Sequence, residues 1–218
     1  MNIPGELEPL KARIRELETE IRVQKEEISR LKDENRRWAR MAGTDALTGL
    51  PNKVSFLRAI VPQAIQQAAR DQNAAGFMLI SADNLGPVNE SHGREAGDRV
   101  IRALAELLRS LLDPGDRIGH LDGTHFAAIL YPGELDLVRG RANMIRARVR
   151  GHSFPYGEGT TQITVSVGIA SVEPETGANH RQLGEDVVRQ LNDAVYAAKK
   201  ASGNRVEVAR DNRGEGDR

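Results

Sequence analysis

Apolar side chains in the first forty residues recur at alternating spacings of three and four, which places them on one stripe of a helix. The apolar positions are Leu7, Leu10, Ile14, Leu17, Ile21, Ile28, Leu31 and Trp38, and the polar residues Gln24 and Asn35 fill the two remaining positions of the stripe. Isoleucine dominates the a positions and leucine the d positions, a pattern that favours a parallel two-stranded coiled coil, and a polar Asn35 at an a position specifies register. We therefore predict that residues 1–43 form a helix that dimerises with a second copy.

Charged residues beside this stripe agree with a parallel pair. In such a dimer each g residue meets the e residue five places later in the partner helix. The resulting pairs are Glu6 with Lys11, Arg13 with Glu18, Glu20 with Lys25, and Glu27 with Lys32, all of opposite charge. The alternative, a single solvated amphipathic helix, does not require that agreement. Each exposed pair contributes only about 0.3–0.5 kcal/mol, so the charges select the partner and the apolar stripe supplies the stability.

The pattern changes after the helix to that of a compact domain over residues 44–209. Turn formers in residues 43–53 end the helix. Helices are predicted over 54–71, 94–112, 135–150 and 181–201, with Pro62 kinking or splitting the first, and strands over 77–80, 162–172 and 206–209. Residues 210–218 are charged and are predicted to be a disordered tail. The order of elements predicts an α+β sandwich, in which helices flank a central, mostly antiparallel sheet.

Residues 117–130 contain two short apolar runs that meet at Asp122-Gly123. Asp-Gly between such runs predicts a two-residue β-hairpin with a type I′ turn, which needs positive φ at both central residues. The tip should therefore be tight and exposed. It could hold polar groups against a ligand, although most hairpin tips only reverse the chain.

Composition narrows the range of functions. The chain has 218 residues, 39% hydrophobic and 28% charged, which is enough for one sizeable core. Its 31 basic residues equal its 31 acidic ones, so the overall charge favours neither nucleic acid nor a membrane surface as a partner. The absence of cysteine excludes disulfides and thiolate metal clusters. No stretch reaches the roughly 20 apolar residues of a membrane helix, and the N-terminus is too charged for a signal peptide, so we expect a cytoplasmic protein.

Five segments of the compact domain form a recognisable series. They are Asp45-Ala-Leu-Thr-Gly-Leu-Pro-Asn-Lys53, Val88-Asn-Glu-Ser-His-Gly-Arg-Glu-Ala-Gly-Asp98, Val165-Ser-Val-Gly-Ile169, Ala194-Val-Tyr-Ala-Ala-Lys-Lys200 and Asn204-Arg205. Together they resemble the GGDEF family, the diguanylate cyclases that condense two GTP molecules into cyclic di-GMP. These segments follow the family order from about residue 44 to 209. The resemblance implies a GGDEF or nucleotidyl-cyclase-like sandwich, in which a preceding coil brings two GTP half-sites face to face.

The resemblance fails where the family binds metal. Its divalent ions are held by the first acid of a D-I-D strand end and by the third residue of the signature, positions that are here Ser81 and Thr124. His125 replaces the acid that follows. Neutral hydroxyls are weak ligands for hard cations. We therefore expect no catalytic residue at these degenerate positions and no metal cofactor, with Mg²⁺ needed only if the chain is a cyclase after all.

The phosphate-binding positions are changed in part. Glycine stands at Gly86 and Gly203, where the family has a lysine and an arginine. The resemblance implies that Asn89 and Asp98 read guanine and that Lys199 contacts phosphate. A structural explanation stays open beside this one, in which Asn89 caps a turn and Asp98 begins a helix.

The family's product-inhibition motif, R-x-x-D, reads Asp113-Pro-Gly-Asp116 and lacks its arginine. This argues against a cyclic di-GMP receptor of the usual kind. Arg146 and Arg150, on the next predicted helix, could contribute to another anion site.

Three hypotheses follow. The first is a catalytically inactive, dimeric regulatory module of cyclic di-GMP signalling that binds another signalling protein, or that retains weak recognition of GTP or another guanine nucleotide. The second is an unorthodox diguanylate cyclase in which Asp83, Asp122 and His125 hold a displaced metal ion. The third is a structural dimer that binds no nucleotide. None of them involves nucleic acid or a membrane.

Overall fold

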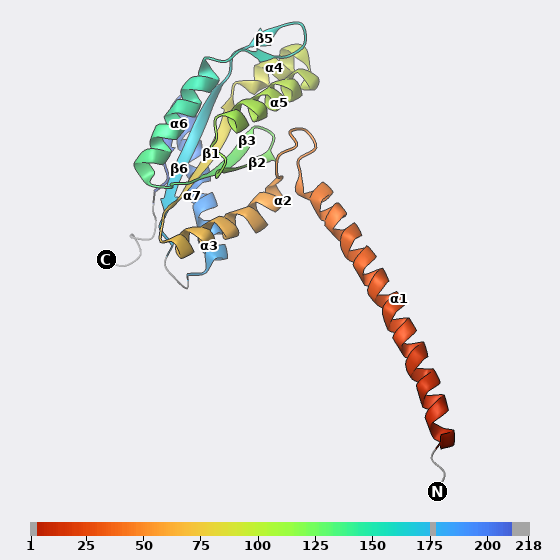
Figure 1. Cartoon of the computed structure of the whole chain (residues 1–218). Coiled ribbons are helices and arrows are strands. Elements are labelled where there is room, and N and C mark those ends of the chain that lie inside the picture. The colour runs from red at the N-terminus through yellow and green to blue at the C-terminus, as the bar shows by residue number, and fades with distance from the viewer. Residues whose placement is uncertain (1–3, 175–177, 211–218) are drawn as a thin grey trace. The chain divides into compact units, whose positions relative to one another are not determined.

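The computed structural model describes residues 4–174 and 178–210, with side chains for residues 11–31, 43–174 and 178–210 (Figure 1). Contacts divide the chain into two compact units, Met1–Ala42 and Gly43–Arg218. None of the helices in the described part is both long enough and apolar enough to cross a membrane.

The first unit is the single helix α1, Pro4–Gly43, as the heptad pattern predicts. Its apolar stripe is open to solvent within one chain: Ile14 is 53% exposed, Ile21 49% and Ile28 50%. Charged neighbours pair along the helix, for example Arg13 with Glu16 at 2.6 Å. The side chains of Leu7, Leu10, Asn35 and Trp38 lie outside the described ones. An exposed stripe of this kind provides the surface that a partner helix would bury, and the pairing itself stays a prediction.

The second unit is built on a five-stranded sheet in the order β2-β3-β1-β6-β7. The strands are β1 (Ala75–Asp83), β2 (Arg117–Asp122), β3 (His125–Leu130), β6 (Thr164–Val172) and β7 (Val206–Val208). All neighbours are antiparallel except β6 and β7. All nine residues of β1 are buried. A separate small ribbon pairs β4 (Phe154–Pro155) with β5 (Thr160–Thr161).

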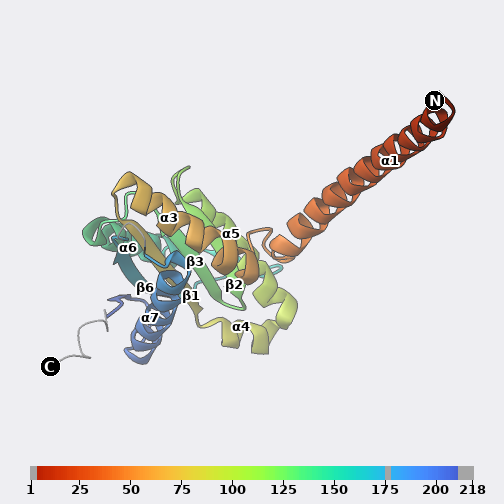
Figure 2. The same cartoon turned by 90° about the horizontal axis from the view of Figure 1, so that it is seen from below.

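Helices cover both faces of the sheet (Figures 1 and 2). Alternation along β1 sends Met78 and Ile80 toward α4 (Leu85–His92), α5 (Arg94–Ser110) and α6 (Leu135–Arg150). Phe77 and Leu79 point the other way, toward η1 (Phe56–Ile60), α3 (Val61–Asp71) and α7 (His180–Lys200). The predicted α+β sandwich is confirmed.

Several elements differ from those that periodicity predicts. The helix expected over 54–71 is split into the single turn α2 (Lys53–Ser55), the π-helical η1 and α3. Pro62 lies in the first turn of α3, and its missing N–H accounts for the interruption. The helix α4 and the ribbon of β4 and β5 were not predicted, because α4 has only eight residues and contains Gly86 and Pro87.

The hairpin of β2 and β3 is confirmed, but the predicted turn is wrong by one residue. Asp122 pairs with His125 in the ladder, so Gly123 and Thr124 form the turn. Of the turn residues only Gly123 has positive φ, at 37°. The register shifts between His120 and Asp122, and this irregularity moves the turn one place along the chain.

Asp83, the last residue of β1, ties three segments together. One carboxylate oxygen accepts a hydrogen bond from Ser166 Oγ at 2.8 Å, and the other accepts from Thr164 Oγ1 at 2.8 Å and from the backbone N–H of Asn204 at 3.0 Å. The Asp83 residue is only 8% exposed. It therefore anchors the loop before β7 to β1 and β6.

We expect Asp83→Ala to loosen this end of the sheet. Hydrogen bonds to a charged group contribute roughly 1.5–3 kcal/mol each, so losing this set should destabilise the domain by roughly 3 kcal/mol. Amide hydrogen exchange of Val206–Val208 should accelerate much more than that of α6. Asp98→Ala, which removes an exposed carboxylate, is the matched control. Unchanged exchange in β7 would contradict the assignment.

Candidate functional site

The two positions that would carry the metal-binding acids lie side by side in the sheet. Ser81, at the end of β1, is completely buried, and its cross-strand partner is His125. Its Oγ lies 3.2 Å from Thr124 Oγ1, so one hydroxyl donates a hydrogen bond to the other. The backbone N–H of Ala82 donates to the carbonyl oxygen of Thr124 at 3.0 Å. The two hydroxyls therefore satisfy each other and present no negative charge.

The hairpin tip carries a small charged group of its own. Asp122 Oδ1 lies 2.9 Å from His125 Nδ1, and Asp122 Oδ2 lies 3.3 Å from Lys53 Nζ. Burial alone would raise the pKa of Asp122, but the hydrogen bond from His125 and the nearby Lys53 hold this pKa below its usual range. Asp122 thus links the hairpin to the segment that precedes η1.

The hypothesis that Asp83, Asp122 and His125 hold a displaced metal ion is not supported by this geometry. Asp83 directs both oxygens to β6 and to the loop before β7. Asp122 and His125 bind each other at the hairpin tip. In the described part of the chain, no group of three or more histidine, aspartate or glutamate side chains could hold a metal ion. We correct this expectation, because each carboxylate is already committed to a different segment.

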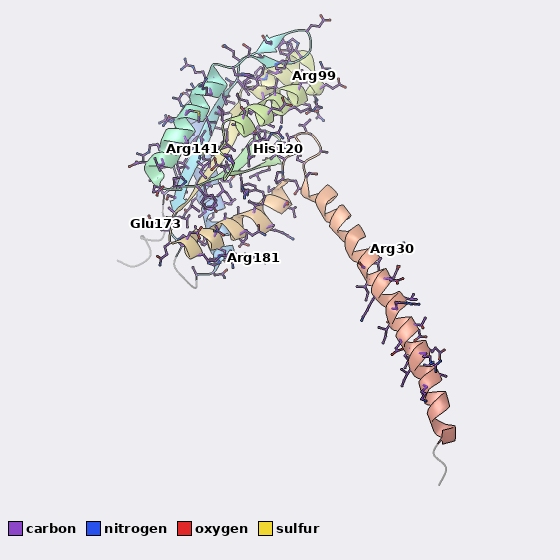
Figure 3. All side chains as sticks on the ribbon, viewed as in Figure 1. Arg30, Arg99, His120, Arg141, Glu173 and Arg181 are labelled. Carbon is purple, nitrogen blue, oxygen red and sulfur yellow. The ribbon has the colours of Figure 1, made fainter. Side chains whose placement is uncertain are left out.

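His120, which the sequence did not point to, lies on β2 and is labelled in Figure 3. It connects Asp45, the first residue of the segment 45–53, to the hairpin of β2 and β3. Its Nδ1 lies 2.9 Å from Asp45 Oδ1 and its Nε2 lies 3.2 Å from the carbonyl oxygen of Gly123, while the ring packs on Phe126. Burial would raise the pKa of Asp45, but hydrogen bonds from Thr48 and His120 hold this pKa below its usual value. The only sequence signal was a polar residue in a half-buried strand.

The candidate guanine-binding residues lie where α4 packs against α5. Asn89, on α4, is half-buried, and its Oδ1 has no hydrogen-bond partner among the described residues. This oxygen lies so close to Gly97 that a Cβ there would collide with it, which places Asn89 beside the turn that carries Asp98. Asp98 is exposed and makes no hydrogen bond or ion pair with the described residues.

The alternative explanation, in which Asn89 caps a turn and Asp98 begins a helix, does not match the observed helix ends. Asn84 is the N-cap of α4 and Gly93 that of α5, and neither cap uses the side chain of Asn89. Asp98 lies beyond the first turn of α5, which begins at Arg94. Neither residue therefore has a capping role that would account for its presence.

Of the three positions that the resemblance assigns to phosphate binding, 86, 199 and 203, only one carries a charged side chain. Lys199 is exposed in the last turn of α7. Gly86 lies in the first turn of α4, with nothing within 4 Å of the place a Cβ would occupy. Gly203 has a positive φ of 68° and lies against Asp83, since its Cβ would be 3.1 Å from Asp83 Oδ2.

An arginine of α6 binds the aspartates of residues 113–116, the segment that corresponds to the family's product-inhibition motif. Arg141, on α6, contacts Asp116 Oδ2 at 2.5 Å and Asp113 Oδ2 at 3.2 Å. The Asp116 side chain is completely buried and also accepts a hydrogen bond from the backbone N–H of Tyr131. Arg146 is held too, because it donates to Asn204 Oδ1 at 3.1 Å. An anion site formed by Arg146 and Arg150 would therefore have to compete with the hydrogen bond that Arg146 already makes to Asn204.

Comparison with known proteins identifies the domain. The family model described as "Diguanylate cyclase, GGDEF domain" matches residues 42–205. Diguanylate cyclase DgcP of Pseudomonas aeruginosa is 30% identical over 95% of this chain and 29% of its own length. Diguanylate cyclase DgcM of Escherichia coli is 32% identical over 76% of this chain and 38% of its own length. The chain thus spans only about a third of these relatives.

A solved structure shows the same architecture. The coiled coil and GGDEF domain of DgcB from Caulobacter crescentus, in complex with c-di-GMP, aligns with a TM-score of 0.72 and 26% identity. The alignment covers 88% of this chain and 99% of that one. With the family model spanning most of the second unit, this chain belongs to the GGDEF family of diguanylate cyclase domains.

Proposed function

We propose that this chain is a catalytically inactive GGDEF protein that acts as a dimeric regulatory module in cyclic di-GMP signalling. One observation carries the proposal: Ser81 and Thr124 replace both metal-binding acids and hydrogen-bond to each other at 3.2 Å. Joining a 3′-hydroxyl to an α-phosphate requires divalent metal to neutralise the triphosphate and activate the attacking oxygen. Two mutually bonded, neutral hydroxyls do not supply the anionic oxygens that Mg²⁺ prefers.

The alternative, an unorthodox diguanylate cyclase, gains no support. It needs a second set of carboxylates near the end of β1, but Asp83 is bonded to β6 and Asp122 to Lys53 and His125. A purely structural dimer is also disfavoured, because Asn89 and Asp98 are left without partners in the described part of the chain. The output of an inactive module would be binding, either of another signalling protein or of a guanine nucleotide.

Dimerisation is the other half of the proposal. The exposed stripe of α1 repeats as a coiled-coil seam, and its g and e charges are complementary between parallel helices. The match to DgcP extends over 95% of this chain, and the DgcB structure that aligns with it includes a coiled coil. A paired α1 would hold two GGDEF domains together whether or not either domain turns over GTP.

We expect no cyclic di-GMP when the purified full chain is incubated with GTP and either Mg²⁺ or Mn²⁺. The reason is that the site lacks the carboxylates that hold the metal ions. Product is measured by liquid chromatography with mass detection, and DgcM assayed in parallel confirms the conditions. Turnover that disappears when EDTA is added would contradict the proposed inactivity.

The coiled coil predicts a second result. Ile14→Asp combined with Ile21→Asp should convert the dimer to a monomer near 23.9 kDa, because each buried isoleucine lost from a core costs about 2–5 kcal/mol. Light scattering after size exclusion measures the mass. Val23→Asp is the matched control, since Val23 is 58% exposed but lies outside the seam. A monomeric unmodified chain, or a dimer that survives the double substitution, would count against the assignment.

A further inference from the structure

Helix α6 has apolar residues on two opposite sides. The side that packs on the sheet is buried and consists of Val138, Ala142, Ile145 and Val149. The other side is exposed, and its apolar residues, which we call the outer stripe, are Leu137, Gly140, Met144 and Ala147. These four recur at spacings of three, four and three, so they lie in one line along the helix. The core of the domain uses only the first set.

The outer stripe is open to solvent. Leu137 is 50% exposed and Met144 is 37% exposed. A Cβ added at Gly140 would find no heavy atom within 4 Å. In both views of the domain α6 lies at its edge (Figures 1 and 2). Because the solvated face of a helix is normally polar, an aligned set of large and small apolar residues indicates a contact surface.

Two arginines border the outer stripe at its C-terminal end. Arg148 follows Met144 by four residues and Arg150 follows Ala147 by three, so each lies next to the stripe. Both are exposed, and neither guanidinium pairs with another described residue. The other three arginines of α6 each contact a group of the domain. The helix dipole favours cations in the last turn, but it does not account for the apolar residues beside them.

Charge and side-chain size select the occupant of this surface. Helix α6 contains five arginines and one aspartate, so packing against the α6 of a second copy would bring like charges together. A helix that binds an anionic membrane carries large residues on its apolar face, whereas Gly140 and Ala147 make up half of the outer stripe. Small residues allow the backbone of another helix to approach closely. The surface therefore fits a helix that brings negative charge.

We propose that the outer stripe of α6 binds an acidic amphipathic helix of a partner protein. The apolar side chains of that helix pack on Leu137 and Met144. Its carboxylates form charge-assisted hydrogen bonds with Arg148 and Arg150. Since Asp136, whose side chain is 92% exposed, lies at the opposite end of α6, the charges also fix the direction of the partner helix. The inference rests on the proposed function, whose output is binding, and names the surface and the chemistry of the partner.

Fluorescence anisotropy of two labelled synthetic peptides, titrated with the full chain, tests the proposal. Both peptides have about 20 residues, long enough to form a helix, and carry leucine along one side. One has glutamate beside the leucines, and the other has lysine at the same places. The glutamate peptide should bind at least about tenfold more tightly than the lysine peptide. Equal affinities, or no binding of the glutamate peptide at about 1 mM, would overturn the proposal.

Variants of α6 locate the binding surface. Met144→Asp adds a negative charge to the outer stripe, and Gly140→Leu fills the space that a partner helix would occupy. Each should weaken the glutamate peptide at least about tenfold, and both positions are open enough to leave the fold intact. Val54→Asp is the matched control, since it places the same charge at a valine that is 60% exposed outside α6. Unchanged affinity in both α6 variants would count against the assignment.

Two further measurements separate this proposal from its alternatives. The full chain should stay in solution when phosphatidylglycerol vesicles are sedimented, and sedimentation that Met144→Asp abolishes would assign the stripe to a membrane instead. If the glutamate peptide does not bind and GTP yields no cyclic di-GMP, the inference fails while the inactive module stands. Formation of cyclic di-GMP would contradict the proposed function, whatever the peptides do.

Discussion

The pairing of β1 between β3 and β6 is the constraint on which the candidate site depends. All nine residues of β1 are buried, and the strand is hydrogen-bonded along both edges. A one-residue slip would exchange the side chains that pack in the two core layers, one on each face of the sheet, and close packing in both layers therefore specifies the register. That register places Ser81 opposite His125 and Asp83 opposite Thr164. The positions of the degenerate residues therefore follow from the packing of the core.

The side chains of Ser81 and Thr124 suit each other as neighbours, because each can hydrogen-bond to the other. Ser81 is completely buried, and a buried hydroxyl without a partner is costly. Thr124 supplies that partner across the strand pair. Asp113 and Asp116 are paired in a comparable way, because Arg141 from α6 forms ion pairs with both. In both places the polar side chains are satisfied by partners within the domain.

The sequence patterns predicted the helices and strands better than they predicted the contacts between side chains. Periods of 3.6 and 2 predicted α5, α6, α7 and the alternating strand β6, because burial on one face imposes them. They missed the short helix α4 and the split at Pro62, where local composition breaks the period. The same patterns gave no reason to choose His120, since one histidine in a strand carries no partner information.

The sequence by itself determined the heptad stripe of α1, the order of the family motifs and the presence of hydroxyl side chains, Ser81 and Thr124, at two positions. These are properties of residue identity and spacing along one chain. Only the tertiary structure decided that Asp83 bonds to Thr164 and Ser166 and that Asp122 bonds to Lys53. The reason is physical: a carboxylate pairs with a donor that folding brings within about 3 Å, and Thr164, Ser166 and Lys53 all lie far along the chain from the carboxylates that they contact.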